Sequence, residues 1–113
     1  MKKRVSKRPW GGLKQFTLNE NSTVKILTIL PKKRFSLQYH SKRKEFWKFL
    51  DAPALVTLGK RTFKVKRGSE LLIPKKTLHR IQALNKPVSV LEISFGNFSE
   101  KDIKRIKDDF GRS

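Results

Sequence analysis

The sequence has no cysteine among its 113 residues, which excludes a disulfide framework, a zinc–thiolate site and a thiol nucleophile. It also lacks any apolar run close to the roughly 18 residues that a membrane-spanning helix requires. The first eight residues carry the positive charge of a signal peptide's first region, but no apolar stretch follows them. We therefore expect a soluble, cytoplasmic protein.

Acidic residues are scarce, since nine Asp and Glu oppose 28 Lys and Arg and leave a net charge of +19. Such a charge can reflect contact with nucleic-acid phosphates, a lysine-rich background, or attraction of a phosphorylated small molecule. The sequence contains no recognised RNA-binding motif, and its aromatics are not interleaved with basic residues as a stacking platform requires. These absences disfavour nucleic acid as the partner.

The length predicts a single domain over residues 1–113, with residues 1–7 as a basic, flexible N-terminal arm. Short runs of β-branched and aromatic residues, separated by Gly and Pro, predict strands. The predicted strands cover residues 23–29, 35–40, 45–50, 54–58, 61–65, 70–73, 79–84 and 88–95. Short strands at regular spacing are typical of an all-β sandwich or barrel.

The last residues show a different pattern. Ser99 is a candidate helix N-cap with Asp102 three positions later, close to a capping box. Ile103 and Ile106 then give one apolar ridge. This pattern predicts a short C-terminal helix that ends near residue 107.

Histidine is also rare, with only His40 and His79 in the chain. Gln38 and His40 are two residues apart, so a strand projects them from the same face. Glu45 follows closely, and His79 comes from a later strand. Two imidazoles, a carboxylate and a carboxamide oxygen in one cavity can hold a divalent metal. The alternative is that both histidines are hydrogen-bonded interior residues.

Four short stretches carry a resemblance to a known family. They are Arg8-Pro9-Trp10-Gly11; Phe35-Ser36-Leu37-Gln38-Tyr39-His40 with Arg43, Glu45 and Trp47; Ile73-Pro74 with His79-Arg80; and Glu92 with Gly96, Glu100-Lys101-Asp102-Ile103 and Asp108-Asp109-Phe110-Gly111-Arg112. The chain resembles the C-terminal cupin domain of type II mannose-6-phosphate isomerases, which is often fused to a mannose-1-phosphate guanylyltransferase. The resemblance implies a cupin double-stranded β-helix, or jelly-roll barrel, with a metal in its mouth. It also implies conversion of mannose 6-phosphate to fructose 6-phosphate.

The chain departs from the usual cupin pattern at one ligand position, where Lys42 replaces the second histidine. A protonated lysine is not a metal ligand, so the expected ligands are His40, Glu45 and His79, joined by Gln38 if its side-chain oxygen contributes. A Gln, His, Glu, His set resembles the ligands of the zinc-dependent type I isomerases. We therefore expect Zn, although Mn, Co, Ni and Fe also suit these ligands.

Aldose–ketose isomerisation needs a base, a group that polarises the sugar oxygens, and a grip on the phosphate. We assign Glu92 and Arg80 as catalytic candidates, with a salt bridge to one of the barrel's many cations as the alternative role of Glu92. Arg43, Lys42 and Arg112 are candidates for binding the phosphorylated sugar, because guanidinium and ammonium groups pair with phosphate.

Two classes of function remain open at this point. The first is a metal-dependent sugar-phosphate isomerase that acts on mannose 6-phosphate. The second is a non-catalytic cupin that binds a sugar phosphate or sugar nucleotide, or that assists a separate guanylyltransferase. In either case we expect a homodimer, with Trp10 and Trp47 as aromatics of the core or of the dimer face.

Overall fold

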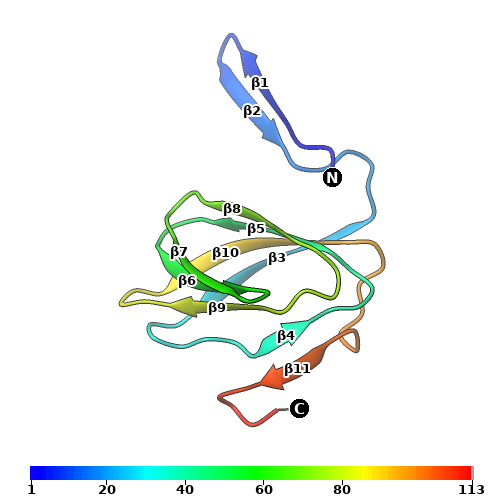
Figure 1. Ribbon diagram of the computed structural model, residues 1–113. Coiled ribbons are helices and arrows are strands. Elements are labelled where there is room, and N and C mark those ends of the chain that lie inside the picture. Colours follow the sequence, from blue (N-terminus) through cyan, green and yellow to red (C-terminus); the bar gives the residue numbers. More distant parts are fainter. Residues whose placement is uncertain (113) are drawn as a thin grey trace.

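The computed structural model describes residues 1–112, which form three antiparallel sheets and no helix (Figure 1). One sheet is a hairpin of β1 (Arg4–Arg8) and β2 (Gly11–Gln15). The other two have the strand orders β3-β10-β5-β8 and β11-β4-β9-β6-β7. Their strands are β3 (Ser22–Ile29), β4 (Leu37–Tyr39), β5 (Glu45–Phe49), β6 (Ala54–Leu58), β7 (Arg61–Val65), β8 (Glu70–Ile73), β9 (His79–Ala83), β10 (Val88–Phe95) and β11 (Lys104–Lys107).

The two larger sheets face each other and enclose one apolar core. Because side chains alternate along a strand, each strand sends every second residue inward. Trp47 and Phe49 of β5 and Val90 of β10 meet Val56 and Ile81 of the facing sheet, and all five are fully buried. This arrangement confirms the all-β prediction and places Trp47 in the core.

Strand pairing brings the predicted ligands to one end of the barrel. Gln38 of β4 lies opposite His79 of β9. Glu45 begins β5 and lies opposite Ser94 of β10. His40 follows β4 directly. Residues far apart in the sequence therefore gather where β4, β5 and β9 meet.

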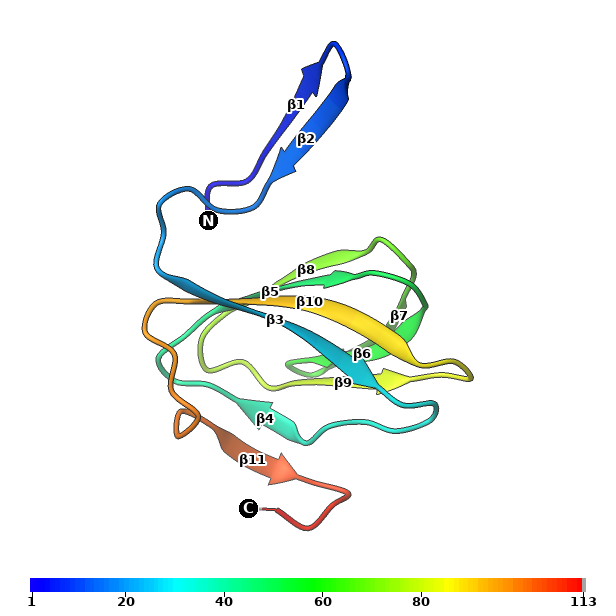
Figure 2. The same cartoon turned by 180° about the vertical axis from the view of Figure 1, so that it is seen from behind.

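The N-terminal hairpin projects away from the barrel in both views (Figures 1 and 2). Residues 4–8 pair along their whole length with β2, whereas the sequence predicts a loose arm there. A strand held by backbone hydrogen bonds to its neighbour needs no apolar alternation, so the pattern gave no signal for it. Trp10 lies at the hairpin turn and is 74% exposed, which excludes a place in the core.

The predicted C-terminal helix is wrong, because the chain makes one turn and then forms β11. The backbone N–H of Asp102 donates to the carbonyl of Ser99, so the helical start is limited to that turn. The Asp102 carboxylate accepts hydrogen bonds from the backbone of Ser41 and Lys42 instead of supporting a helix. A segment this short is a marginal helix, and the edge of β4 offers β11 backbone partners.

No helix within residues 1–112 is long and apolar enough to cross a membrane.

Candidate metal centre and substrate pocket

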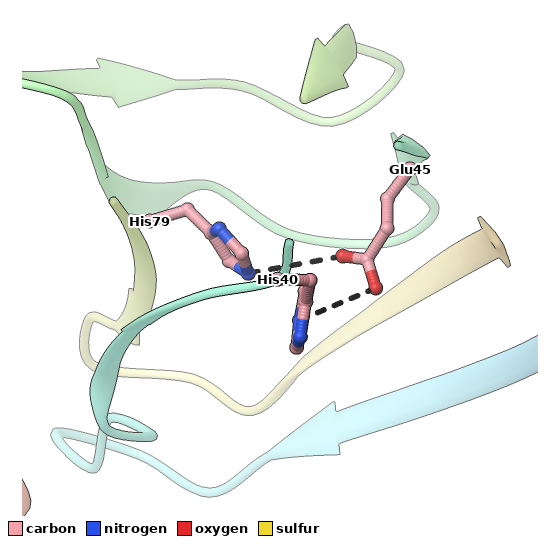
Figure 3. A group of neighbouring side chains, drawn as sticks. All are labelled: His40, Glu45 and His79. Atoms are coloured by element: carbon pink, nitrogen blue, oxygen red, sulfur yellow. Dashed lines mark ion pairs between the residues drawn. The ribbon is translucent and has the colours of Figure 1, made fainter. Parts of the chain in front are cut away.

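His40, Glu45 and His79 point their polar atoms at one another in the mouth of the barrel (Figure 3). The Nε2 atom of His40 lies 3.6 Å from Oε2 of Glu45, and Nε2 of His79 lies 3.8 Å from Oε1. All three residues are buried, and their candidate ligand atoms lie within 4.8 Å of one another. The cluster joins three separate segments of the chain.

Hydrogen bonds fix which imidazole nitrogen faces the cluster. Nδ1 of His40 donates to the carbonyl of Asp102 at 2.6 Å, and Nδ1 of His79 donates to the carbonyl of Thr77 at 2.9 Å. A carbonyl can only accept, so both protons are on Nδ1 and both Nε2 lone pairs face Glu45. Nε2 of His79 is buried without a hydrogen-bond partner.

Burial keeps both imidazoles neutral at pH 7. Loss of hydration lowers the pKa of His79 from 6.5 to about 4, and the nearby Glu45 carboxylate only partly opposes this effect. The pKa of His40 is also lowered, again mainly by burial. Neutral imidazole is the form that binds metals.

The cluster fits a divalent metal. Ligand atoms about 2.0–2.2 Å from one ion lie roughly 2.8–3.6 Å apart in octahedral or tetrahedral geometry. The observed separations of 3.6 and 3.8 Å lie just above that range, and all three candidate ligand atoms lie within 4.8 Å of one another, so the side chains must draw together to hold one ion. A buried nitrogen lone pair without a donor, next to a carboxylate, is the polar arrangement that a cation completes.

Arg43 is a buried cation against the same cluster. Its Nε donates to Oε2 of Glu45 at 3.0 Å, and a terminal nitrogen lies 3.2 Å from Nε2 of His40. The guanidinium also donates to the carbonyl of Ser99 and stacks over the ring of Phe98. Arg43 thus neutralises the Glu45 carboxylate and contacts two atoms, Oε2 of Glu45 and Nε2 of His40, that would serve as metal ligands.

A pocket of about 270 Å³ opens beside the cluster. Of the residues that the sequence predicts for the site, it brings together Gln38, His40, Arg43, Glu92 and Arg112. Burial, followed by the Glu45 charge, raises the pKa of Glu92 from 4.5 to about 7. A carboxyl group that titrates near neutral pH suits proton transfer.

Three predicted residues either lie outside the pocket lining or are already hydrogen-bonded within it. Arg80 donates to the carbonyls of Phe35 and Lys107, so it ties the loop before β4 to β11 and does not line the pocket. Lys42 is exposed and also absent from the pocket lining. Gln38 lines the pocket, but its Oε1 accepts a hydrogen bond from Ser36 at 2.5 Å.

Sequence reasoning missed other residues of the pocket, namely Lys25, Glu100 and Arg105. Lys25 interrupts an apolar strand, and that break in the alternation was an available signal. Its Nζ donates to Glu100 at 3.2 Å. The sequence also did not indicate that Asp102 belongs to the site. The backbone carbonyl of Asp102 accepts the hydrogen bond that orients His40, and no sequence pattern identifies a backbone contact of this kind.

Comparisons with known proteins agree with the family resemblance of the sequence. A family model described as "Mannose-6-phosphate isomerase C-terminal" matches residues 1–108. The chain is 33% identical over 108 residues to alginate biosynthesis protein AlgA of Pseudomonas aeruginosa, covering 94% of this chain and 22% of the relative. It is 32% identical to mannose-1-phosphate guanylyltransferase RfbM of Salmonella typhimurium, with the same coverage of 94% and 22%. The chain thus spans less than a quarter of these curated relatives.

A solved structure supports the fold over nearly the whole chain. The dTDP sugar isomerase of Desulfovibrio desulfuricans superposes with a TM-score of 0.71 at 15% identity, covering 96% of this chain and 82% of that one. At this identity the likeness concerns the fold alone.

Proposed function

Because the chain belongs to the family of mannose-6-phosphate isomerase C-terminal domains, we propose that it is a metal-dependent sugar-phosphate isomerase. The proposed reaction is the interconversion of mannose 6-phosphate and fructose 6-phosphate. The observation that carries the proposal is the buried trio His40, Glu45 and His79, with two imidazole lone pairs directed at a carboxylate beside a polar pocket.

The trio would hold the metal, for which zinc is the first candidate and Gln38 a fourth ligand after release from Ser36. When bound, a divalent metal supplies Lewis acidity toward the sugar oxygens. Arg43 orients the Glu45 carboxylate through the 3.0 Å hydrogen bond from its Nε.

Glu92 is the proposed acid–base group. Reversible isomerisation requires one group to take a proton from the sugar C2 and to return a proton at C1. The Glu92 carboxyl lines the pocket, and its pKa of about 7 lets it accept and release a proton at neutral pH.

Cations at the pocket rim would hold the phosphate. Lys25, Arg105 and Arg112 all line the pocket. The Arg112 guanidinium also donates to Asp108, which holds it in place. A guanidinium fork matches two oxygens of a phosphate group. The net charge of +19 adds long-range attraction for an anionic sugar.

The proposal is limited to isomerase chemistry. The guanylyltransferase name belongs to a relative of which this chain covers 22%. We therefore assign no nucleotide transfer to this chain.

Two observations favour a second candidate, a non-catalytic cupin that binds a sugar phosphate or sugar nucleotide, or that assists a separate guanylyltransferase. Arg43 already contacts both Glu45 and His40, so a permanent cation neutralises the cluster. In addition, Lys42 stands where the family resemblance expects a histidine. A domain with those two features can retain the pocket without binding a metal.

The test is fructose 6-phosphate production from mannose 6-phosphate, with chelator-treated protein to which Zn, Mn or Co is returned. We expect turnover that depends on metal, disappears in His79→Ala and survives in Gln82→Ala, a control on the same strand outside the pocket. Absence of turnover with every metal would rule out this reaction. Binding of the sugar phosphate without turnover would support the second candidate.

A further inference from the structure

A second hollow opens next to the pocket that the proposed sugar phosphate occupies. We call it the tail hollow; its walls include Ile29, Leu30, Arg34 and Phe110, and its volume is about 260 Å³. These walls come from the end of β3, the loop that follows β3 and the C-terminal tail (residues 108–112). The proposed isomerisation gives none of these four side chains a role.

The tail hollow adjoins the pocket beside the trio, because two residues line both spaces. Phe35 and Arg112 are the shared residues. Phe35 also packs edge-on against His79 of the trio, with the ring centroids 6.5 Å apart. The pocket of about 270 Å³ and the tail hollow of about 260 Å³ are each slightly smaller than the roughly 300–1,000 Å³ of typical small-molecule sites. Together they lie within this range, so one ligand can extend from the trio into the tail hollow.

The walls of the tail hollow combine exposed apolar surface with positive charge. Phe110 is 58% exposed and Leu30 is 62% exposed, which leaves a flat ring and an aliphatic side chain open to a ligand. Lys33, Arg34 and Arg112 also line the hollow, and within residues 1–112 no carboxylate does. Nucleobases stack on aromatic rings and on Arg guanidinium planes, and phosphate pairs with Arg and Lys. The lining therefore suits a nucleotide.

Carboxylates of the tail hold it in the position that forms the hollow. Arg34 donates to both carboxylate oxygens of Asp109, at 2.7 and 3.0 Å. The Arg112 guanidinium donates to both carboxylate oxygens of Asp108, at 2.9 and 3.2 Å. Gly111 has a φ of 74°, a left-handed conformation that glycine adopts without strain. The tail thus turns back on itself, and Phe110 and Arg112 both line the hollow.

Arg112 stands where the two spaces meet, and its place sets the order of the ligand's parts. Lys25 and Arg105 line the pocket, and Lys33 lines the tail hollow. A diphosphate at Arg112 would therefore have further cations toward either end. A hexose fits the polar pocket on one side of this junction, and a base fits the exposed ring of Phe110 on the other.

We propose that the pocket and the tail hollow together bind a nucleoside diphosphate hexose. The hexose occupies the pocket beside the trio, the diphosphate lies at Arg112, and the base stacks on Phe110. Such a ligand excludes a sugar phosphate from the pocket, so it inhibits the proposed reaction competitively. The inference rests on the proposed function for the sugar end of the ligand, and it adds a base subsite that the isomerisation does not need.

Calorimetric titration of the full chain with GDP-mannose and with mannose 1-phosphate tests the base subsite. The two probes carry the same hexose, which is that of the proposed reaction, and only GDP-mannose carries a nucleoside. We expect GDP-mannose to bind at least about tenfold more tightly, because a stacked base adds affinity. Equal affinities for the two probes would overturn the proposal.

Phe110→Ala isolates the contribution of the ring. We expect this variant to bind GDP-mannose about tenfold more weakly and mannose 1-phosphate within about twofold of wild type. Phe110→Trp should keep the affinity for GDP-mannose, since it restores a flat ring. Ile106→Ala is the matched control, because Ile106 is 50% exposed on β11 and lines neither space. The proposal is wrong if Phe110→Ala binds GDP-mannose like wild type, or loses affinity equally for both probes.

Competition with mannose 6-phosphate tests whether the two spaces form one site. We expect the apparent dissociation constant of GDP-mannose to rise in proportion to the mannose 6-phosphate concentration. Simultaneous, independent binding of both ligands would show two separate sites and would also overturn the proposal. These titrations detect binding without turnover. A chain without isomerase activity can therefore still pass the first two tests, and an active isomerase can fail them, so the two proposals fail separately.

Discussion

Replacement of Arg43 by alanine should destabilise the metal-free protein strongly. Arg43 is 8% exposed, and its partner Glu45 is 1% exposed. Without the guanidinium, the hydrogen bonds that remain to the Glu45 carboxylate within residues 1–112 are the weaker contacts from Trp47 and Ser94, at 3.3 and 3.4 Å. Removal of one member of a buried ion pair costs about 3–5 kcal/mol, because the other charge is left uncompensated. For a domain of this size this loss lowers the melting temperature by about 10–20 °C.

The same substitution should strengthen zinc binding. In the wild-type protein a metal must compete with Arg43 for Oε2 of Glu45 and Nε2 of His40. Hydrogen bonds to charged groups contribute about 1.5–3 kcal/mol each, so release from even one of them raises metal affinity by about tenfold or more. Zinc should then restore most of the stability that Arg43→Ala loses.

Urea unfolding with chelator or with zinc measures both effects. Arg67→Ala is the control, since Arg67 is exposed in a turn, and we expect a change within about 0.5 kcal/mol. If chelated Arg43→Ala unfolds at the same urea concentration as Arg67→Ala, the ion pair does not stabilise the fold. If zinc stabilises Arg43→Ala no more than wild type, Arg43 does not compete with the metal.

Three further predictions concern the same site. Glu92→Gln should abolish turnover. In the wild-type protein, the pKa of Glu92 is raised from 4.5 to about 7, so the free energy of unfolding should fall by about 3 kcal/mol as the pH rises from 4.5 to about 7. Urea unfolding of Glu92→Gln should not show this fall. The wild-type free energy of unfolding should also fall by about 3 kcal/mol as the pH drops from 6.5 to about 4, because His79 is protonated in that range only in the unfolded state. His79→Gln should not show this fall. A variant whose unfolding free energy changes with pH in parallel with wild type would contradict the corresponding prediction. Asp102→Ala should weaken zinc binding about 10–100-fold in competition with a chromophoric chelator, because the loop that orients the imidazole loses its carboxylate acceptor. Asp51→Ala, which loses a similar backbone contact far from the site, should bind zinc like wild type.

Strand positions in the barrel were predictable from short stretches of sequence. Alternating apolar residues indicate which side of a strand is buried, and turn residues mark where each strand ends. The predicted strand at residues 88–95 matches β10, and the hairpin of β6 and β7 forms around Gly59 as expected. The hairpin of β1 and β2 and the edge strand β11 were missed. Both are basic and exposed, and they are held by backbone pairing that leaves no apolar period in the sequence.

The sequence by itself determined the all-β class through its short alternating runs and the family through four short stretches. Its two rare histidines and their spacing also marked Gln38, His40, Glu45 and His79 as candidate metal ligands. Only the tertiary structure decided what surrounds them. It buried Glu92 beside a second carboxylate, brought Arg43 against the cluster and turned Arg80 toward backbone carbonyls. Those outcomes depend on burial and on contacts between segments that are far apart in the chain. A local pattern of neighbouring residues carries no information about such contacts.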